Sequence, residues 1–346
     1  MSIKLEIINP LEYEKWDDLV LSTNDYCFFH SSAWARILIE TYGYIPAYFT
    51  AVENDKLMAS IPFMEIKSLI TGRRGVSLPF SDYCNPIIDD NIPRRDIIDQ
   101  VISYAKKRGW KSIGFRGNPV YGEDITPSSS CYKHTVDLSE GEEKVFANFK
   151  SNVRRNIRKA EKQELRLEIC HSVDSVKRFY RLQCRTRKRH GLPPQPYMLF
   201  DRIHKHILSN HAGFVILASD KGNTIAGAMF FHYGRTGTYK YGASDTRYQH
   251  LRPNELIMWE AMKWYTQNGF TSLSLGKSES QNEGLRRYKS GLGGREETVK
   301  YYKYDVACES FVKEHSKTRG FHNRIFRVLP IPVLKIAGRL LYKHIG

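Results

Sequence analysis

The sequence predicts an α/β (α+β) fold made of two similar halves, each a mixed and mostly antiparallel sheet flanked by helices. Its 346 residues are enough for about two domains. Hydrophobic residues make up 41% and charged residues 26% of the chain, which is ordinary globular composition. One succession of strand-like and helix-like runs occurs twice in the same order, at an offset of about 160 to 167 residues.

The first half begins with two helical patterns, at residues 11–20 and 32–42. A hairpin follows at residues 48–63, where the polar turn Glu53-Asn-Asp-Lys separates two apolar strands. A helix then begins near Pro93 and ends at Gly109, and residues 110–115 form a strand. Proline near the start and glycine just past the end are the expected helix boundaries.

The second half repeats these elements. Helical patterns at residues 173–189 and 197–208 precede a hairpin at residues 214–231, whose turn is Asp220-Lys-Gly-Asn. A helix begins after Pro253 and ends at Gly269, and the strand 270–275 follows. Each half is therefore predicted to contain two helices, a hairpin, a long strand, a helix and a strand.

Between the halves lie a predicted strand at residues 132–138 and a polar helical run at residues 140–163. We assign the run to a link between domains. The predicted division is an N-terminal domain at 1–138, a basic helical linker at 139–165, a C-terminal domain at 166–310 and a basic amphipathic tail at 311–346.

Composition limits the compartment and the partners. The formal net charge is +16, which favours anionic partners. The six cysteines are scattered, with no C-x-x-C pair and no histidine at zinc-finger spacing from two of them, so we predict reduced thiols and no metal site. The first residues do not resemble a signal peptide, and no run of 18 apolar residues occurs, so a cytoplasmic protein is expected.

The tail has its own pattern. On a helix over residues 333–346, Lys335, Arg339 and Lys343 form one stripe, and apolar residues cover the opposite side. Basic residues also precede it: Lys317, Arg319, Arg324 and Arg327. Such a helix can lie on an anionic membrane, which would place the protein peripherally on the inner face of the cell membrane, or it can dock on its own protein. The sequence leaves both interpretations open.

Three stretches carry a resemblance to a known family: Arg154-Arg-Asn-Ile-Arg-Lys-Ala-Glu-Lys162, Gly242-Ala-Ser-Asp245, and Leu285-Arg-Arg-Tyr-Lys-Ser-Gly-Leu-Gly-Gly294 with the strand after it. Their context resembles the GNAT acyltransferase fold, and two such units joined by a basic helical segment resemble the FemAB family. That family includes the aminoacyltransferases that build peptidoglycan cross-bridges and relatives found with exopolysaccharide and exosortase systems. The resemblance covers nearly the whole chain.

The resemblance implies an acyltransferase of enzyme class 2.3, without a tightly bound cofactor, that uses an activated acyl donor as co-substrate. GNAT enzymes that use acyl-CoA hold its pyrophosphate on a glycine-rich turn. The equivalent stretch here, Arg247-Tyr-Gln-His-Leu-Arg-Pro-Asn254, contains no glycine. Side chains would obstruct a close approach of backbone to phosphate, which favours aminoacyl-tRNA or another activated acyl group over acetyl-CoA.

We predict three catalytic residues. Lys289, between Tyr288 and a glycine-rich stretch, is placed to hold a phosphate or an oxyanion. Asp245 is a candidate base for the attacking amine, or else a cap for the next turn, and Asp82 is the parallel candidate in the first half. The predicted substrate-binding residues are Arg154, Arg155, Arg158, Lys159, Tyr241, Arg247 and Tyr288.

The leading hypothesis is N-acyl transfer to an amine of a cell-envelope precursor, peptidoglycan or exopolysaccharide. The expected partners are an anionic donor (tRNA or CoA), a lipid-linked or amino-sugar acceptor and an anionic membrane surface, with no DNA. Two alternatives remain: an acyl-CoA-dependent acetyltransferase acting on a small amine, and a non-catalytic RNA- or membrane-binding protein on a GNAT scaffold. The residues do not identify the donor, the acceptor or the oligomeric state.

Overall fold

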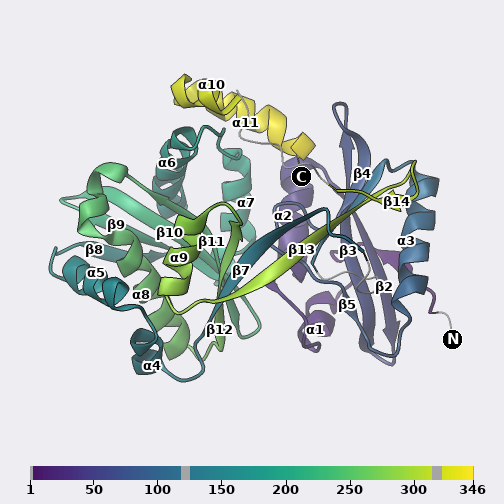
Figure 1. The fold of residues 1–346 in the computed structure, drawn as a ribbon, viewed down its shortest axis with the longest axis horizontal. Helices are drawn as coiled ribbons and strands as arrows, with labels where there is room; N and C mark the ends of the chain where they lie inside the picture. Colours follow the sequence, from purple (N-terminus) through teal and green to yellow (C-terminus); the bar gives the residue numbers. More distant parts are fainter. Residues whose placement is uncertain (1–2, 118–124, 314–321, 346) are drawn as a thin grey trace. The chain divides into compact units, whose positions relative to one another are not determined.

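The computed structural model describes residues 3–117, 125–313 and 322–345. The chain divides into two compact units. Unit 1 comprises Met1–Cys131, Thr298–Lys317 and Leu340–Gly346, and unit 2 comprises Tyr132–Glu297 and Thr318–Arg339. Each unit has its own set of neighbouring strands and a core of its own (Figure 1).

Unit 1 contains a sheet in the order β1-β2-β3-β4-β6-β13, with the short β5 on β3 and β14 on β13. Helix α3 packs on one face, and α1 and α2 pack on the other. Its elements are β1 (Glu6–Ile8), α1 (Trp16–Leu21), η1 (Phe28–His30), α2 (Ser32–Tyr42), β2 (Ile45–Glu53), β3 (Lys56–Ser68), β4 (Gly72–Val76), β5 (Ile87–Ile88), α3 (Arg94–Arg108), β6 (Ser112–Arg116), β13 (Arg295–Asp305) and β14 (Ser310–Phe311).

Unit 2 contains a sheet in the order β7-β12-β11-β10-β9-β8. Helices α6 and α7 cover one face, and α8 covers the other, with α5 packed against α8 (Figure 1). Its elements are β7 (Ser129–Asp137), α4 (Glu142–Ala147), α5 (Ser151–Glu161), β8 (Arg166–Cys170), α6 (Val173–Arg189), α7 (Tyr197–His206), η2 (Leu208–Asn210), β9 (Gly213–Asp220), β10 (Asn223–Tyr233), β11 (Thr236–Ser244), η3 (Thr246–Leu251), α8 (Pro253–Gln267), β12 (Ser272–Glu279) and α9 (Glu283–Gly291).

The predicted repeat and fold class are confirmed. In both units a short strand, two helices, three antiparallel strands, a helix and a last strand follow one another. In both, the last strand is parallel to the strand before the helix: β6 to β4 and β12 to β11. The hairpin turns also match, because Asn54 and Asp55 in one and Lys221 and Gly222 in the other have positive φ, as a two-residue type I′ turn requires.

The units differ from the predicted domains at several places: residues 132–138 belong to unit 2, the tail is divided between the units, and two further differences have a clear physical cause. Helices α4 and α5, expected to form a linker, belong to unit 2, where Val145, Val153 and Ile157 join its hydrophobic core. Residues of β13 from Thr298 onward, expected in the second domain, belong to unit 1, where β13 pairs with β6. Burial of apolar side chains decides the first case, and strand pairing decides the second.

The tail forms α10 (His322–Val328) and α11 (Ile331–Ile345). Leu334, Gly338 and Tyr342, spaced four apart, are buried against the protein. Val333, Ile336 and Leu340 lie on another side of α11 and are exposed, as are Ile325 and Val328 of α10 and Ile345. The helix therefore docks on the protein and still presents apolar side chains to solvent.

Lys317 and Arg319 lie outside the described residues. Among the described helices, none is both long and apolar enough to cross a bilayer.

Candidate functional site

The candidate site of unit 2 lies where two parallel strands part. The ladder between β11 and β12 extends only from Thr236 to Thr238 on β11, so the last part of β11 is not bound to β12. A β-bulge at Lys240 interrupts the pairing of β11 with β10, because Met229 pairs with Tyr241 and Phe230 with Tyr239. Bulges commonly redirect side chains next to functional sites.

The bulge turns Tyr239 along its own strand toward Gly242. A Cβ atom on Gly242 would lie 1.9 Å from the Tyr239 hydroxyl, so this position requires glycine. Burial raises the pKa of Tyr239 to about 12, so its phenol keeps its proton at neutral pH. The glycine of the Gly242–Asp245 motif thus has a packing reason.

Lys289 lies on α9 and is only 3% exposed. Its Nζ donates hydrogen bonds to the main-chain oxygens of Gly276 (3.0 Å) and Lys277 (2.8 Å), where β12 has left β11. Tyr288, the neighbouring residue, packs against the core of unit 2. Burial, with electrostatic contributions from Tyr239 and Glu255, holds the pKa of Tyr288 well above its usual value. Helix α9 therefore joins both parted strands through adjacent side chains.

Asp245 follows the last residue of β11 and accepts a hydrogen bond from the Arg247 backbone N–H, as the cap of η3. Its Oδ2 lies 2.7 Å from Nη2 of Arg247 and 3.7 Å from Nη1 of Arg185. The hydrogen bond from Arg247 lowers the pKa of Asp245. A carboxylate held in this way is a weak base at neutral pH, which favours the capping interpretation over the catalytic one.

Arginines line a pocket of about 510 Å³ beside Asp245. It is formed by α6, the β9–β10 turn and the start of η3, and its charged lining residues are Asp174, Arg178, Arg181, Arg185, Asp245 and Arg247. Arg178 is held by Glu168 (2.9 Å) and Thr224 (2.9 Å), whereas Arg185 and Arg247 are largely exposed. Four guanidinium groups against two carboxylates suit a phosphate-bearing ligand.

The segment equivalent to the phosphate-binding turn of acyl-CoA enzymes is η3, a 3₁₀ helix. Arg252 follows it with a left-handed φ of 59° and precedes Pro253, the first residue of α8. Every residue of this turn therefore carries a side chain. In acyl-CoA enzymes the equivalent turn binds pyrophosphate through exposed backbone N–H groups.

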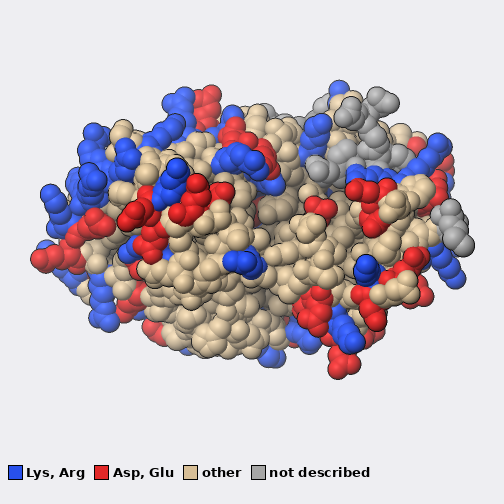
Figure 2. All heavy atoms as spheres, turned by 90° about the horizontal axis from the view of Figure 1, so that it is seen from below, with Lys and Arg blue, Asp and Glu red and all other residues tan. Residues whose placement is uncertain are grey.

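The basic residues of α5 are distributed around one side of the helix. Val153 and Ile157 face the core of unit 2, whereas Arg155, Arg158 and Lys159 are exposed. Arg154 is half-buried and donates a hydrogen bond to the Ala147 carbonyl (2.9 Å). Figure 2 shows Lys and Arg gathered at the end of unit 2 where α5, β8 and β9 lie.

The other predicted residues lie apart from the arginine-lined pocket. Tyr241 packs on Phe200 of α7, with 5.3 Å between ring centroids. Asp82 lies in unit 1, half-buried in the loop before β5, where its carbonyl accepts a hydrogen bond from Tyr301. Of the predicted residues, the structure pairs Asp245 with Arg247 and places Tyr288 and Lys289 side by side on α9.

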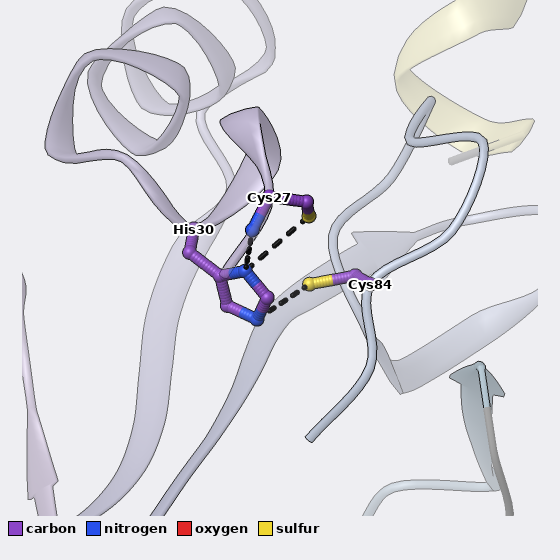
Figure 3. Close-up of side chains that lie close together, drawn as sticks. All are labelled: Cys27, His30 and Cys84. Carbon is purple, nitrogen blue, oxygen red and sulfur yellow. Dashed lines mark hydrogen bonds between the residues drawn. The ribbon is translucent and has the colours of Figure 1, made fainter. Parts of the chain in front are cut away.

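Besides Arg178, Arg181 and Arg185 of the pocket, two groups of residues were not predicted. In unit 2, His134 on β7 is fully buried, its Nε2 lies 3.0 Å from Glu296, and burial together with Lys289 lowers its pKa. In unit 1, Cys27, His30 and Cys84 lie together in the core (Figure 3). Burial would raise the pKa of the Cys27 thiol, but Cys84 and His30 hold it well below its usual value. Sequence spacing offers only Cys27-x-x-His30 as a signal for the second group.

Comparison with known proteins places this site in a recognised domain type. Residues 147–290 match the acetyltransferase (GNAT) domain family. The chain is similar in structure to FemX, with 13% identity and a TM-score of 0.68 over 86% of this chain and 96% of FemX. It is also similar to the C-terminal domain (DUF2156) of a putative lysylphosphatidylglycerol synthetase from Agrobacterium fabrum, with 15% identity and a TM-score of 0.55 over 85% and 92% of the two chains.

A tandem GNAT protein from the clavulanic acid biosynthesis pathway has 7% identity and a TM-score of 0.56, over 87% of this chain and 98% of that one. No curated protein matches the sequence. At such identities the likeness concerns the fold. The predicted resemblance to FemAB-like tandem GNAT proteins is thereby confirmed in architecture, and residues 147–290 match the GNAT acetyltransferase domain family.

Proposed function

We propose that this protein transfers an acyl or aminoacyl group from an activated, phosphate-bearing donor to an amine of a cell-envelope precursor or polysaccharide. The observation that carries the proposal is the arginine-lined pocket at the end of β11, the strand that parts from β12 after Thr238. In this proposal Arg181, Arg185 and Arg247 bind the donor phosphates. Binding there would bring the donor's carbonyl toward the parted strands, where proximity to the amine lowers the barrier.

Asp245 and Lys289 position other groups in this scheme. Asp245 fixes the guanidinium of Arg247 through its bonds at 2.7 and 3.1 Å. Lys289 donates hydrogen bonds to two main-chain carbonyls of β12. In this scheme those bonds hold in place the part of the strand that faces the reaction. Asp82 remains a proposed acceptor-side residue of unit 1.

The test is transfer by the purified protein. It is incubated with charged tRNA or with acyl-CoA, together with amino-sugar acceptors, and products are followed by mass spectrometry. We expect transfer with wild-type protein and loss of transfer in the Arg181→Ala/Arg185→Ala variant. The matched control is Arg94→Ala/Arg95→Ala, two exposed arginines of α3. Transfer with neither donor, or equal activity in both variants, contradicts the proposal.

For the donor, we favour an aminoacyl ester such as aminoacyl-tRNA over acyl-CoA. The support is η3, whose side chains replace the glycine-rich backbone nest. One similar structure is named for lysylphosphatidylglycerol synthesis, a product that carries an aminoacyl group. The second candidate is an acyl-CoA N-acyltransferase, and micromolar binding of CoA in isothermal titration would favour it instead.

For the acceptor, we favour a lipid-linked molecule. A mostly apolar groove of about 480 Å³ runs beside α11 in unit 2, lined by Tyr180, Pro196, Tyr197, Met198, Lys335, Ile336 and Arg339. Lys335 Nζ lies 5.4 Å from the Tyr180 ring centroid, so the groove has a positively charged group over one of its aromatic rings. An apolar floor with two cations suits a lipid chain that carries a phosphate.

We also propose that an anionic bilayer surface binds the exposed apolar side chains of the tail and of the β3–β4 turn. Leu69 is fully exposed and Ile70 largely so, and Lys67, Arg73 and Arg74 flank them. Within unit 1, Arg74 donates a hydrogen bond to the His344 carbonyl (2.7 Å), and His344 Nδ1 lies 3.1 Å from the Ser68 hydroxyl. The turn and the end of α11, which presents Leu340, Lys343 and Ile345, are therefore neighbours. Apolar residues flanked by cations are typical of interfacial binding.

Vesicle flotation tests this part. We expect the protein to float with vesicles that contain phosphatidylglycerol and to remain behind with vesicles of phosphatidylcholine alone, with binding that weakens as salt rises. Failure to float with anionic vesicles at low salt contradicts membrane binding but leaves the transfer assay above unaffected.

A further inference from the structure

A buried group of sulfur and nitrogen atoms lies in unit 1, apart from the site described above. Cys27 immediately precedes the single turn η1, which returns the chain so that His30 faces it, and Cys84 comes from the loop that follows β4 (Figure 3). Cys27 Sγ lies 3.3 Å from His30 Nδ1, and Cys84 Sγ lies 3.4 Å from His30 Nε2. The three donor groups lie within 4.8 Å of one another, and all three residues are buried.

The separation between Cys27 Sγ and His30 Nδ1 is close to that of two ligands around a tetrahedral metal, whereas Cys84 Sγ lies beside the other ring nitrogen and must turn toward Nδ1. With zinc–sulfur bonds of about 2.3 Å and zinc–nitrogen bonds of about 2.0 Å, a sulfur and a nitrogen ligand lie about 3.5 Å apart. The Cys27–His30 separation of 3.3 Å needs only a small adjustment to reach that value. Small side-chain rotations of this size are available to cysteine without a backbone shift.

The hydrogen bonds of His30 set the tautomer that a metal requires. His30 Nε2 lies 2.9 Å from the Asn85 carbonyl oxygen, which can only accept, so Nε2 carries the proton. The lone pair is then on Nδ1, on the side of Cys27. Metal-binding histidines usually donate their second N–H to a carbonyl in this way. At present Nδ1 accepts the Cys27 backbone N–H (3.0 Å), and a cation would replace that single bond.

Charge balance selects a divalent ion. Two thiolates and a neutral imidazole around a divalent cation have no net charge, so such a site can be buried without an uncompensated ion. A monovalent ion would leave one negative charge among three residues that are all buried. Two sulfurs and one nitrogen in a closed site are ligands that zinc prefers over magnesium or calcium.

We propose that Cys27, His30 and Cys84 bind a zinc ion in unit 1, with the main-chain carbonyl of Tyr83 as the fourth ligand. The Tyr83 oxygen lies 3.8 Å from Cys27 Sγ. Binding releases the protons of the two thiols, the neutral imidazole binds through Nδ1 without losing a proton, and no electron is transferred. With four protein ligands the site is structural, because no position remains for substrate.

Such a site would tie the η1 turn to the loop that carries Asp82. Cys84 is two residues from Asp82, and its backbone N–H already bonds the Arg116 carbonyl (2.6 Å). A zinc ion would add a second anchor to this loop from the opposite side. The proposal does not depend on acyl transfer, because its evidence is the arrangement of ligands alone.

The test uses the full chain expressed in zinc-supplemented medium. Elemental analysis should find zinc equimolar with protein, and replacement by cobalt should give the visible spectrum and sulfur charge-transfer absorption of a tetrahedral thiolate site. Cys27→Ser/Cys84→Ser should lose both signals, whereas Cys131→Ser/Cys184→Ser, two other buried cysteines, should keep them. Wild-type protein that contains no zinc and gives no cobalt charge-transfer band overturns the proposal.

A second measurement is independent of variants that might not fold. Removing metal from wild-type protein with a strong chelator should lower Tm, and zinc should restore it while magnesium does not. A Tm that is identical with and without chelator, in protein shown to contain zinc beforehand, would place the zinc elsewhere and contradict this site.

Discussion

The carboxylate of Asp245 and the guanidinium of Arg247 form a bidentate pair at the edge of the arginine-lined pocket, with Nε and Nη2 at 3.1 and 2.7 Å from the two oxygens. The same carboxylate caps η3 through the Arg247 backbone N–H. One residue therefore fixes both the turn and the orientation of an otherwise exposed cation. Fixed guanidinium groups bind phosphate at a lower entropic cost than free ones.

Asp245→Asn should weaken donor binding and spare the chemical step. Without the negative charge, Arg247 and Arg185 lose their fixed orientation, so we expect KM for the donor to rise about tenfold or more while kcat changes little. Steady-state kinetics measures both, with the donor that supports transfer in the assay described under Proposed function. A large fall in kcat at saturating donor, with KM unchanged, would instead identify Asp245 as the general base.

The same variant should change how the stability of the fold depends on pH in the acid range. Because Arg247 lowers the pKa of Asp245, the charged carboxylate stabilises the fold above the ordinary aspartate pKa, and this contribution is lost as pH falls through the lowered value. The Tm difference between wild type and Asp245→Asn should therefore be present at neutral pH and shrink in strong acid. A difference that grows toward low pH would contradict the assigned charge state.

Lys289→Met should reduce both stability and turnover. It leaves the Gly276 and Lys277 carbonyls without the ammonium that they accept from, which costs about 1–3 kcal/mol for a buried polar group. We expect a lower free energy of unfolding, and a lower kcat at a temperature where the variant is still folded. The matched control is Lys162→Met, an exposed lysine after α5. If the folded Lys289→Met variant keeps the full kcat, the role of Lys289 is structural only.

Much of the fold could be predicted because local rules agree with tertiary structure. Residues 32–42 and 173–189 form helices with the predicted bounds, since capping serines precede both. The hairpins follow from turn residues that tolerate positive φ. What failed was the assignment of segments to units: β13 has the pattern of a strand, but its pairing with β6 joins residues nearly 190 positions apart, which no local pattern encodes.

The sites were predicted less completely for the same reason. The Tyr-Lys-Ser-Gly motif indicated Lys289, and spacing did place Asp245 at the end of a strand. Three of the four arginines of the pocket come from α6, which sequence patterning describes only as a basic helix, and the β9–β10 turn completes the pocket. Likewise, Cys84 lies 54 residues from His30, and only the fold brings its sulfur within 3.4 Å of the imidazole.

Gly338→Ala should displace α11 from the protein. A Cβ atom at this position would lie 1.9 Å from the Pro194 carbonyl oxygen, so the helix or the loop must move. In a helix, alanine is more favourable than glycine by up to about 1 kcal/mol. A net loss of stability would therefore show that the steric clash outweighs this gain. Gly284→Ala on α9 is the control, because its Cβ meets open space. We expect faster limited proteolysis of the tail and a lower Tm in the first variant alone; equal behaviour of the two would contradict the docking of α11.

Leu69→Glu/Ile70→Glu should abolish vesicle binding without changing the fold. Both side chains are exposed, so their replacement leaves the core intact, and Tm should be unchanged. Burying a leucine and an isoleucine in a bilayer interface contributes roughly 1.5–3 kcal/mol each, so the affinity for phosphatidylglycerol vesicles should fall by at least about a hundredfold. The control is Ile7→Glu, an exposed apolar residue of β1 far along the chain from the β3–β4 turn. If Leu69→Glu/Ile70→Glu and Ile7→Glu bind anionic vesicles equally well, the β3–β4 turn does not insert, and any residual binding must come from α10 and α11.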